Sequence, residues 1–317
     1  MGTPTRAGAR DLFFRAGTGV FALVLVLIVV GIAMVLWRES LLSIRTFGFR
    51  FWRTGIWNPV AGNFGALPFI WGTLYSSCLA LVLAAPISIG IAVFLSELCP
   101  DRLRQPLVFL TELLAAIPSI VYGIWGIFVL VPWVRELQMA LPDSLRALPV
   151  FSGPALGVNL LSAVLILTIM ITPFTSSVAR EVLRSVPAAQ REAAYALGST
   201  RWEAILVALR YGRVGILGAV MLGFGRALGE TMAVTMVIGN NPQVSWSVFK
   251  PQYTMASVIA NEFTEASDAL HRDALVEIGL VLFAITLAVN LASRLLIWRM
   301  STPGGRWRRP LAERASA

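Results

Sequence analysis

The sequence predicts an all-α integral membrane protein built from six transmembrane helices. Of its 317 residues, 57% are hydrophobic and only 14% are charged, and the mean hydropathy is +0.75. A soluble domain of this size could not bury so much apolar surface, so part of its solvent must be lipid. The chain also contains six apolar runs, each near the roughly 20 residues that a helix needs to cross a bilayer.

The apolar runs follow one another along the chain with polar segments between them. They cover residues 20–37, 69–95, 107–133, 154–178, 214–239 and 274–298. We therefore expect one transmembrane domain with a tail on each side and one long cytoplasmic loop. The expected bounds are 1–17 for the N-terminal tail, 18–300 for the domain, 179–213 for the loop and 301–317 for the basic C-terminal tail.

The basic residues indicate how the spans are oriented. With the N-terminus in the cytoplasm, 17 arginines fall in cytoplasmic segments and 8 basic residues fall outside. Cytoplasmic loops of membrane proteins carry the excess of arginine and lysine. We therefore expect both termini in the cytoplasm. The net charge of +9 is then explained by these segments facing the bilayer, and no nucleic-acid partner is expected.

The first outer loop, 38–68, mixes basic and aromatic side chains. Arg45, Arg50 and Arg53 alternate there with phenylalanine and tryptophan residues. Such a mixture favours the membrane–water interface, so we interpret the loop as an anchoring segment. The alternative is that its arginines raise the local concentration of an anion.

His271 is the only histidine of the chain, and it stands beside Arg272 and Asp273 in a polar stretch. A single histidine excludes a multi-histidine metal cluster, and the two cysteines form no Cys-x-x-Cys motif. We expect His271 to be a solvated loop residue. Neither a metal site nor a bound cofactor is expected in this chain.

The cytoplasmic loop 179–213 is the most informative segment. Pro187 can open a helix at its first turn, and Gly198 supplies the left-handed residue that ends it. Thr200 and Glu203 have the spacing of a capping box, which begins a second helix. The pattern predicts an elbow of two helices joined at a glycine. This elbow either receives another protein or rests on the lipid headgroups, and the pattern alone leaves both open.

Within the elbow, Glu192, Ala193, Ala194, Tyr195 and Gly198 resemble the EAA loop of bacterial ABC importer permeases. The resemblance implies that these residues form a coupling helix, which docks into a groove of a separate ATPase subunit. It also implies the six-helix bundle of the type I ABC importer permeases.

The second half of the loop departs from that family pattern. The family has an isoleucine, a leucine and a proline where this chain has Ala208, Arg210 and Tyr211. Because of this departure, the exit from the elbow is expected to differ, with a turn at Gly212.

No P-loop of the Gly-Lys-Ser/Thr type is present, although an ATP-driven machine needs one. The only lysine, Lys250, lies between Phe249 and Pro251. The chain is therefore expected not to be an enzyme. ATP and Mg would be bound, and ATP hydrolysed, by the partner ATPase.

Two charged residues, Arg226 and Glu230, stand in the fifth apolar run. At four residues' spacing on one helix they can pair, and charges within a membrane usually face a bundle interior or a wet pathway. A guanidinium group binds an oxyanion in bidentate fashion. We therefore interpret Arg226 as a substrate contact that Glu230 holds and partly neutralises. The alternative is a salt bridge that fixes helix packing.

The stretch 223–240, together with the elbow residues, resembles the PstC family of phosphate-specific transport permeases. The segments 57–59, 64–73, 117–126, 261–263 and 270–280 fit as well. The resemblance implies the inner membrane of a bacterium and associates Arg226 and Glu230 with transport. The partners it implies are a PstA-like second permease subunit, two PstB-like ATPase subunits and an extracytoplasmic PstS-like phosphate-binding protein.

By this resemblance, the chain forms half of the pathway of an ATP-driven phosphate importer that works by alternating access. The nearest alternative is a permease for sulfate or molybdate, because an arginine fork does not read the central atom of the anion. An ion-coupled secondary transporter or channel is a further alternative. Such a transporter often shows two repeated halves, and it would not need the elbow. An intramembrane hydrolase would need a nucleophile and a base.

Overall fold

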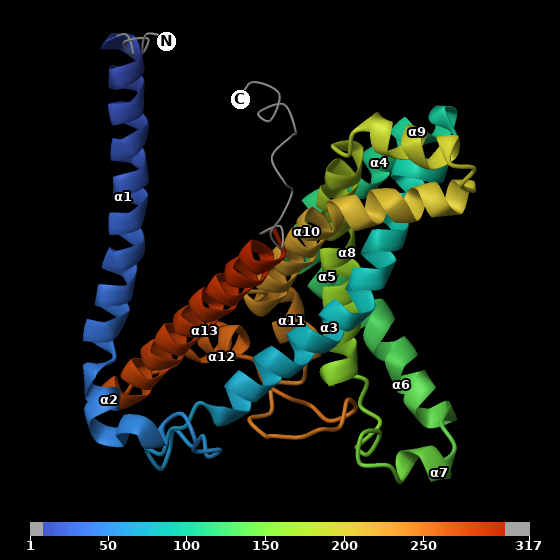
Figure 1. Ribbon diagram of the computed structural model, residues 1–317. Coiled ribbons are helices and arrows are strands. Elements are labelled where there is room, and N and C mark those ends of the chain that lie inside the picture. Colours follow the sequence, from blue (N-terminus) through green and yellow to red (C-terminus); the bar gives the residue numbers. More distant parts are fainter. Residues whose placement is uncertain (1–8, 302–317) are drawn as a thin grey trace. The chain divides into compact units, whose positions relative to one another are not determined.

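The computed structural model describes residues 9–301, which fold into helices without a β-sheet (Figure 1). Six helical segments are long and apolar enough to cross a membrane, which confirms the predicted all-α class and the number of spans. They are Phe14–Glu39, Leu67–Leu98, Ser119–Ala140, Leu160–Arg184, Arg201–Leu228 and Ala269–Met300.

The described residues divide into two compact units, and the long helices α3, α8 and α13 each contribute to both. The first unit contains the residues up to Ser76, Ser119–Ile166 and Gly229–Ile285, and the second contains Ser77–Pro118, Leu167–Leu228 and the residues from Thr286 onwards.

The helices of the first unit are α1 (Ala9–Glu39), α2 (Leu41–Phe47), η1 (Gly48–Arg50), α5 (Ser119–Trp125), η3 (Gly126–Leu130), α6 (Val131–Ala140), α7 (Asp143–Arg146), α11 (Met232–Val237) and α12 (Met255–Glu262). Those of the second are the π-helical turn η2 (Phe94–Leu98), α4 (Asp101–Ala116), α9 (Ala188–Ala196) and α10 (Arg201–Leu228). The shared helices are α3 (Leu67–Val93), α8 (Leu160–Arg184) and α13 (Ala269–Ser301).

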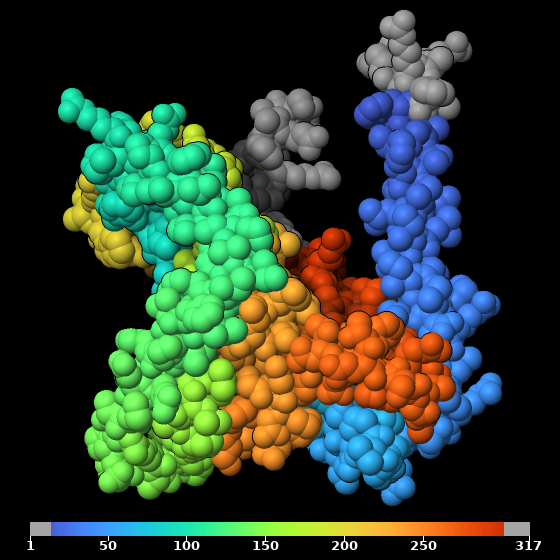
Figure 2. Space-filling view, turned by 180° about the vertical axis from the view of Figure 1, so that it is seen from behind, coloured from blue at the N-terminus to red at the C-terminus, as the bar shows by residue number. Residues whose placement is uncertain are grey.

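Helix α1 has uncovered sides along most of its length. None of the residues in its most apolar window is buried, and Figure 2 shows it as a column whose flanks carry no covering helix. Its C-terminal end leads through the buried Ser40 into α2, where Ser43 is also buried. A helix of this hydropathy is expected to have lipid or another subunit as its neighbour.

The loop 38–68 contributes to a hydrophobic core as well as to the surface. Phe51 and Phe64 are fully buried in a cluster with Phe69, Met255 and Leu275. Phe49, in contrast, is 71% exposed, as an interfacial anchor would be. The loop therefore serves two purposes, because Phe51 and Phe64 pack inward whereas Phe49 faces outward.

The expectation that His271 is a solvated loop residue is wrong. It lies near the start of α13, is 8% exposed, and its Nε2 lies 3.1 Å from Glu262 Oε2. Its ring stacks on Phe64, with 5.2 Å between the ring centroids, and Trp57 Nε1 donates to the same Glu262 oxygen at 2.9 Å. The aromatic residues of the outer loop, far away in sequence, bury the histidine.

The third span begins later than the sequence suggested. The predicted run 107–133 joined the end of α4 to the span, whereas α4 stops at Ala116 and α5 begins at Ser119. Ile117 is extended, with ψ of 129°, because Pro118 disfavours the helical conformation of the residue before it.

The fifth span begins and ends earlier than predicted. Helix α10 starts at Arg201 and continues through Gly212, which is buried, so the predicted turn at Gly212 is wrong. A Cβ atom added at Gly212 would lie 3.3 Å from a methyl carbon of Val182 on α8. The glycine therefore allows α8 and α10 to pack closely instead of breaking the helix.

Gly215 is a second position in this packing where no side chain fits. An added Cβ would lie 2.7 and 2.9 Å from the two methyl carbons of Val182, whose branched side chain has little freedom. We expect Gly215→Leu to destabilise the protein by about 1–3 kcal/mol through overpacking, seen as a lower midpoint of thermal unfolding in detergent. Gly90→Leu is the matched control, because nothing lies within 4 Å of that position. An equal midpoint for the two variants would contradict this account of the α8–α10 contact.

Candidate functional site

The elbow is a short helix with a complete capping structure at its end. Helix α9 follows Pro187, as predicted, and ends at Ala196, with Leu197 as its C-cap and Gly198 in the left-handed region at φ of 81°. The N–H of Gly198 donates to Tyr195 O at 2.9 Å, and that of Ser199 donates to Ala194 O at 3.1 Å. These two bonds define a Schellman motif, which satisfies the last carbonyls of the helix.

The predicted capping box is also confirmed. Thr200 N–H donates to Glu203 Oε2 at 2.7 Å, and Glu203 N–H lies 3.4 Å from Thr200 Oγ1. These bonds begin α10, so the second helix of the elbow is the first part of the fifth span. In Figure 1, α9 and the start of α10 lie side by side at one end of their unit, next to α4.

The elbow presents most of its EAA-like residues to solvent. Glu192, Ala193 and Tyr195 are exposed, and Leu197 is 87% exposed, whereas Ala194 is buried against its own unit. Short side chains beside exposed apolar ones form a surface that a partner protein can approach closely. The structure therefore brings the five predicted coupling residues together on one short, capped element.

Gly198 should be essential to the geometry of the elbow. Valine at φ of 81° is strained by about 1–2 kcal/mol, so we expect Gly198→Val to open the turn and to reduce copurification of the chain with an ATPase subunit, the partner that the resemblance implies. Gly198→Asn is the matched control, because asparagine tolerates the left-handed region. No atom lies within 4 Å of the added Cβ, so a steric effect is not expected. Equal loss in both variants would exclude backbone conformation as the cause.

A partly buried ion pair ties the elbow to the end of α3. Arg191 on α9 donates to both carboxylate oxygens of Glu97 on η2, through Nε at 3.1 Å and through Nη2 at 2.5 Å. Arg201, the first residue of α10, donates to the backbone oxygen of Glu97 at 2.6 Å. Bidentate charge-assisted pairs are strong and geometrically specific. We call this contact of Glu97 with Arg191 and Arg201 the brace.

Arg191 also fixes the end of α8. Its Nη1 donates to Val186 O at 3.0 Å and its Nη2 to Leu183 O at 2.9 Å. One guanidinium group therefore joins three elements of the second unit, namely η2, the end of α8 and α9. A movement of the elbow would be transmitted directly to the ends of two membrane spans.

Arg226 lies in the last turn of α10 and is exposed. Its guanidinium carbon lies 5.7 Å from the centroid of the Phe174 ring, a cation–π distance. Because the structure of the second unit leaves the planar fork uncovered, Arg226 can still offer it to an anion.

Glu230 does not continue the helix of Arg226. Helix α10 ends at Leu228, so the expectation that both charges share one helical face is wrong. Gly229 and Glu230 belong to a non-helical link, and Glu230 Oε1 accepts the N–H of Ala233 at 3.3 Å near the start of α11. A carboxylate satisfies free N–H groups at a helix start, and this local role replaces the predicted i, i+4 pairing.

Comparison with known proteins identifies the family. Residues 84–301 match the family described as "Binding-protein-dependent transport system inner membrane component". Proteins named "Phosphate transport system permease protein PstC" are similar over nearly the whole chain. The protein from Pasteurella multocida is 49% identical over 302 residues, which cover 93% of this chain and 94% of the relative. The protein from Mesorhizobium japonicum is 44% identical over 309 residues, which cover 96% and 94%.

A solved structure supports the fold. The inward-facing MetNI methionine ABC transporter matches with a TM-score of 0.56 at 15% identity, over 73% of this chain and 94% of that chain. At this identity the likeness concerns the fold alone, and it agrees with the predicted importer-permease architecture. Taken with the matches in sequence, it shows that this chain belongs to the binding-protein-dependent inner-membrane transport components, in the PstC family of permeases.

Proposed function

We propose that this chain is one permease subunit of an ATP-driven importer of inorganic phosphate. The observation that carries the proposal is the identity of 44–49% to phosphate transport permeases over more than nine-tenths of the chain. The elbow supports it, because an exposed, capped helix braced to two spans suits a subunit that receives motion from outside the membrane. In the part of the chain that the structure describes, no feature favours sulfate or molybdate over phosphate.

The proposed complex contains four kinds of subunit. This chain and a PstA-like subunit form the pathway, two PstB-like subunits bind ATP with Mg and hydrolyse it, and a PstS-like protein delivers phosphate from outside. With both termini in the cytoplasm, the elbow faces the ATPase, and Glu192, Ala193, Tyr195 and Gly198 form the docking surface.

The proposed mechanism assigns no covalent chemistry to this chain. Closure of the ATPase subunits on ATP moves the elbow, and the brace passes that movement to the ends of α3 and α8. The pathway then changes from outward to inward access. Arg226 contacts the passing anion through its guanidinium fork, and Glu230 lowers the net positive charge along the pathway, so that the anion is released as well as bound.

Uptake by cells tests the proposal. Cells that lack this chain are compared with cells that carry it, with radiolabelled phosphate at low external concentration and radiolabelled sulfate in parallel. We expect the chain to restore phosphate uptake and to leave sulfate uptake unchanged. If the chain restored sulfate uptake instead, the transported anion would be sulfate. If it restored uptake of neither anion, the proposed function would be refuted.

A further inference from the structure

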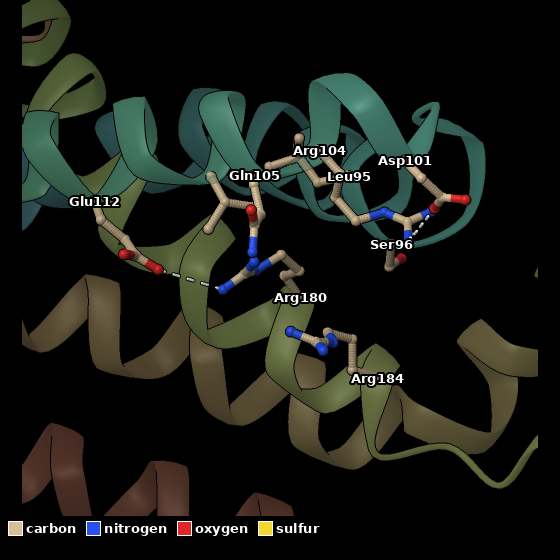
Figure 3. A pocket seen from close by; sticks show the side chains of 9 residues that line it. Leu95, Ser96, Asp101, Arg104, Gln105, Glu112, Arg180 and Arg184 are labelled. Atoms are coloured by element: carbon tan, nitrogen blue, oxygen red, sulfur yellow. Dashed lines mark hydrogen bonds and ion pairs between the residues drawn. The ribbon is translucent and has the colours of Figure 1, made fainter.

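A cavity of about 550 Å³ lies among three elements of the second unit. Its walls are η2, the polar face of α4 and the end of α8 (Figure 3). Its charged and amide residues are Asp101, Arg104, Gln105, Glu112, Arg180 and Arg184. Neither Arg226 nor any of the EAA-like elbow residues lines it, so the cavity is separate from the sites described above.

The charges of this cavity are not fully paired within it. Three guanidinium groups face two carboxylates. Arg104 is held by Asp101 Oδ1 at 2.8 Å and by Cys99 O at 3.0 Å. The remaining lining carboxylate, that of Glu112, pairs with Arg180 at 3.4 Å. Glu181, outside the lining, lies 2.8 Å from Arg180 and 3.8 Å from Arg184. The formal charges of the three arginines are therefore balanced once Glu181 is included, and the capacity of the cavity for an anion depends on guanidinium donors that these carboxylates leave unused.

Arg180 is a buried guanidinium with unused donors. Its side chain is only 9% exposed, and its hydrogen bonds to Glu112 at 3.4 Å and to Glu181 at 2.8 Å both come from Nη2. A guanidinium group carries five N–H donors, and burial of a charge is unfavourable unless its donors are satisfied. Among residues 9–301 no hydrogen bond uses the donors on Nε and Nη1, so these donors are available to a ligand in the cavity.

Arg184 lies one turn further along α8 and adds a second guanidinium group to the wall of the cavity. It is 62% exposed, and its closest carboxylate oxygen, on Glu181, is 3.8 Å away, which is too long for a hydrogen bond. Figure 3 shows both arginines projecting from α8 on the side of α4, with Gln105 reaching towards Arg180 from α4. Two forks one helical turn apart form an arrangement that can hold several oxygen atoms of one tetrahedral anion.

We propose that this cavity binds a phosphate group that carries a proton, either inorganic phosphate or a phosphomonoester. Arg180 and Arg184 hold its oxygen atoms, and Glu112 accepts the hydrogen bond of its P–OH group. Inorganic phosphate keeps at least one P–OH group throughout the neutral range, and a phosphomonoester loses its last such proton only near about pH 6, whereas sulfate and phosphodiesters have no proton to donate at neutral pH. An unprotonated oxygen beside Glu112 would be repelled, so the carboxylate selects the protonated anion.

The position of the cavity connects it to the elbow. The turn η2 supplies Leu95 to the cavity wall and Glu97 to the brace. A ligand in the cavity would therefore adjoin the segment that holds the elbow in place. The inference rests on the proposed function in one respect, because import makes phosphate an abundant anion on the cytoplasmic side. Binding of phosphate to the cavity does not itself require transport.

Binding of radiolabelled orthophosphate to the purified complex tests the site. The complex is held in nanodiscs without the soluble binding protein and carries Arg226→Ala, which removes the proposed pathway contact. We expect Arg184→Gln to raise the Kd at least about tenfold, the loss expected for one charge-assisted contact. Arg102→Gln, an exposed arginine of α4 outside the cavity, is the matched control and should leave the Kd unchanged. Thermal midpoints show whether both variants remain folded.

Two further arms identify the anion and its source. We expect sulfate to compete at least about tenfold more weakly than phosphate, and Glu112→Gln to remove most of that preference. Native mass spectrometry compares phosphatidic acid, a monoester, with phosphatidylglycerol, a diester. Binding that depends on Arg184 in either the orthophosphate arm or the phosphatidic acid arm supports the site. The arm in which it is observed shows whether the bound phosphate group is free phosphate or a lipid headgroup.

Three results would overturn the inference. They are no Arg184-dependent binding in either arm, the same Kd for Arg184→Gln as for Arg102→Gln, or equal competition by sulfate. Its failure is separable from that of the proposed function. Cells that import no phosphate while Arg184-dependent binding persists would refute only the importer, and normal import without such binding would refute only this site.

Discussion

Arg226→Lys is expected to lower phosphate uptake by about 10- to 100-fold while the protein still inserts into the membrane. Lysine keeps the positive charge at the end of α10 but loses the planar fork that binds two oxygen atoms of one anion. A charge-assisted hydrogen bond contributes about 1.5–3 kcal/mol, and each 1.4 kcal/mol corresponds to a factor of ten. Initial rates of labelled phosphate uptake, normalised to the amount of protein in the membrane, measure the effect.

Arg213→Lys is the matched control for Arg226. It makes the same exchange at an exposed arginine on the same helix, away from the proposed contact. Uptake should remain normal in this variant. Normal uptake in Arg226→Lys as well would show that only charge matters at that position, and the bidentate role would have to be abandoned.

Breaking the brace is expected to separate ATP hydrolysis from transport. Glu97→Gln and Arg191→Gln each leave one partner of a largely buried, bidentate ion pair without its counter-charge, which destabilises the contact by about 1.5–3 kcal/mol. We expect the ATPase to remain bound and active, because the exposed face of the elbow is unchanged. The number of ATP molecules hydrolysed per phosphate transported should rise several-fold.

A double-mutant cycle shows whether Glu97 and Arg191 act through each other. Residues of one ion pair have an interaction free energy of about 0.5–3 kcal/mol, so the double variant should be hardly worse than either single one. Asp143→Asn is the control, because its ion pair with Arg146 is long, at 3.9 Å, and exposed, and such pairs contribute little. Fully additive effects of Glu97→Gln and Arg191→Gln would exclude a mechanical role for their contact.

Local signals in the sequence predicted the elbow accurately. A proline before α9, a glycine at a left-handed position and a Thr-x-x-Glu capping box each act within a few residues, and each appears in the structure. The number of spans could also be predicted from the sequence, because hydropathy over about 20 residues is a strong signal. The exact ends of the third and fifth spans were missed because Pro118 and Gly229 interrupt runs that remain apolar.

Contacts between distant parts of the chain could not be predicted. Glu97 and Arg191 are 94 residues apart, and no pattern in a single sequence pairs them. The burial of His271 depends in the same way on Phe64 and Trp57 from the outer loop. One signal was available, since a carboxylate directly at the end of an apolar span requires a partner. It marks Glu97 as important without identifying Arg191.

The most direct test of the account is the accumulation of labelled phosphate in proteoliposomes that contain the complete complex. This chain is reconstituted with its second permease subunit and the ATPase, and the binding protein is added from the side from which it delivers phosphate. The account predicts accumulation that requires ATP, that excess sulfate does not inhibit and that Arg226→Ala abolishes. Accumulation driven by an ion gradient without ATP, or equal transport of sulfate, would contradict it.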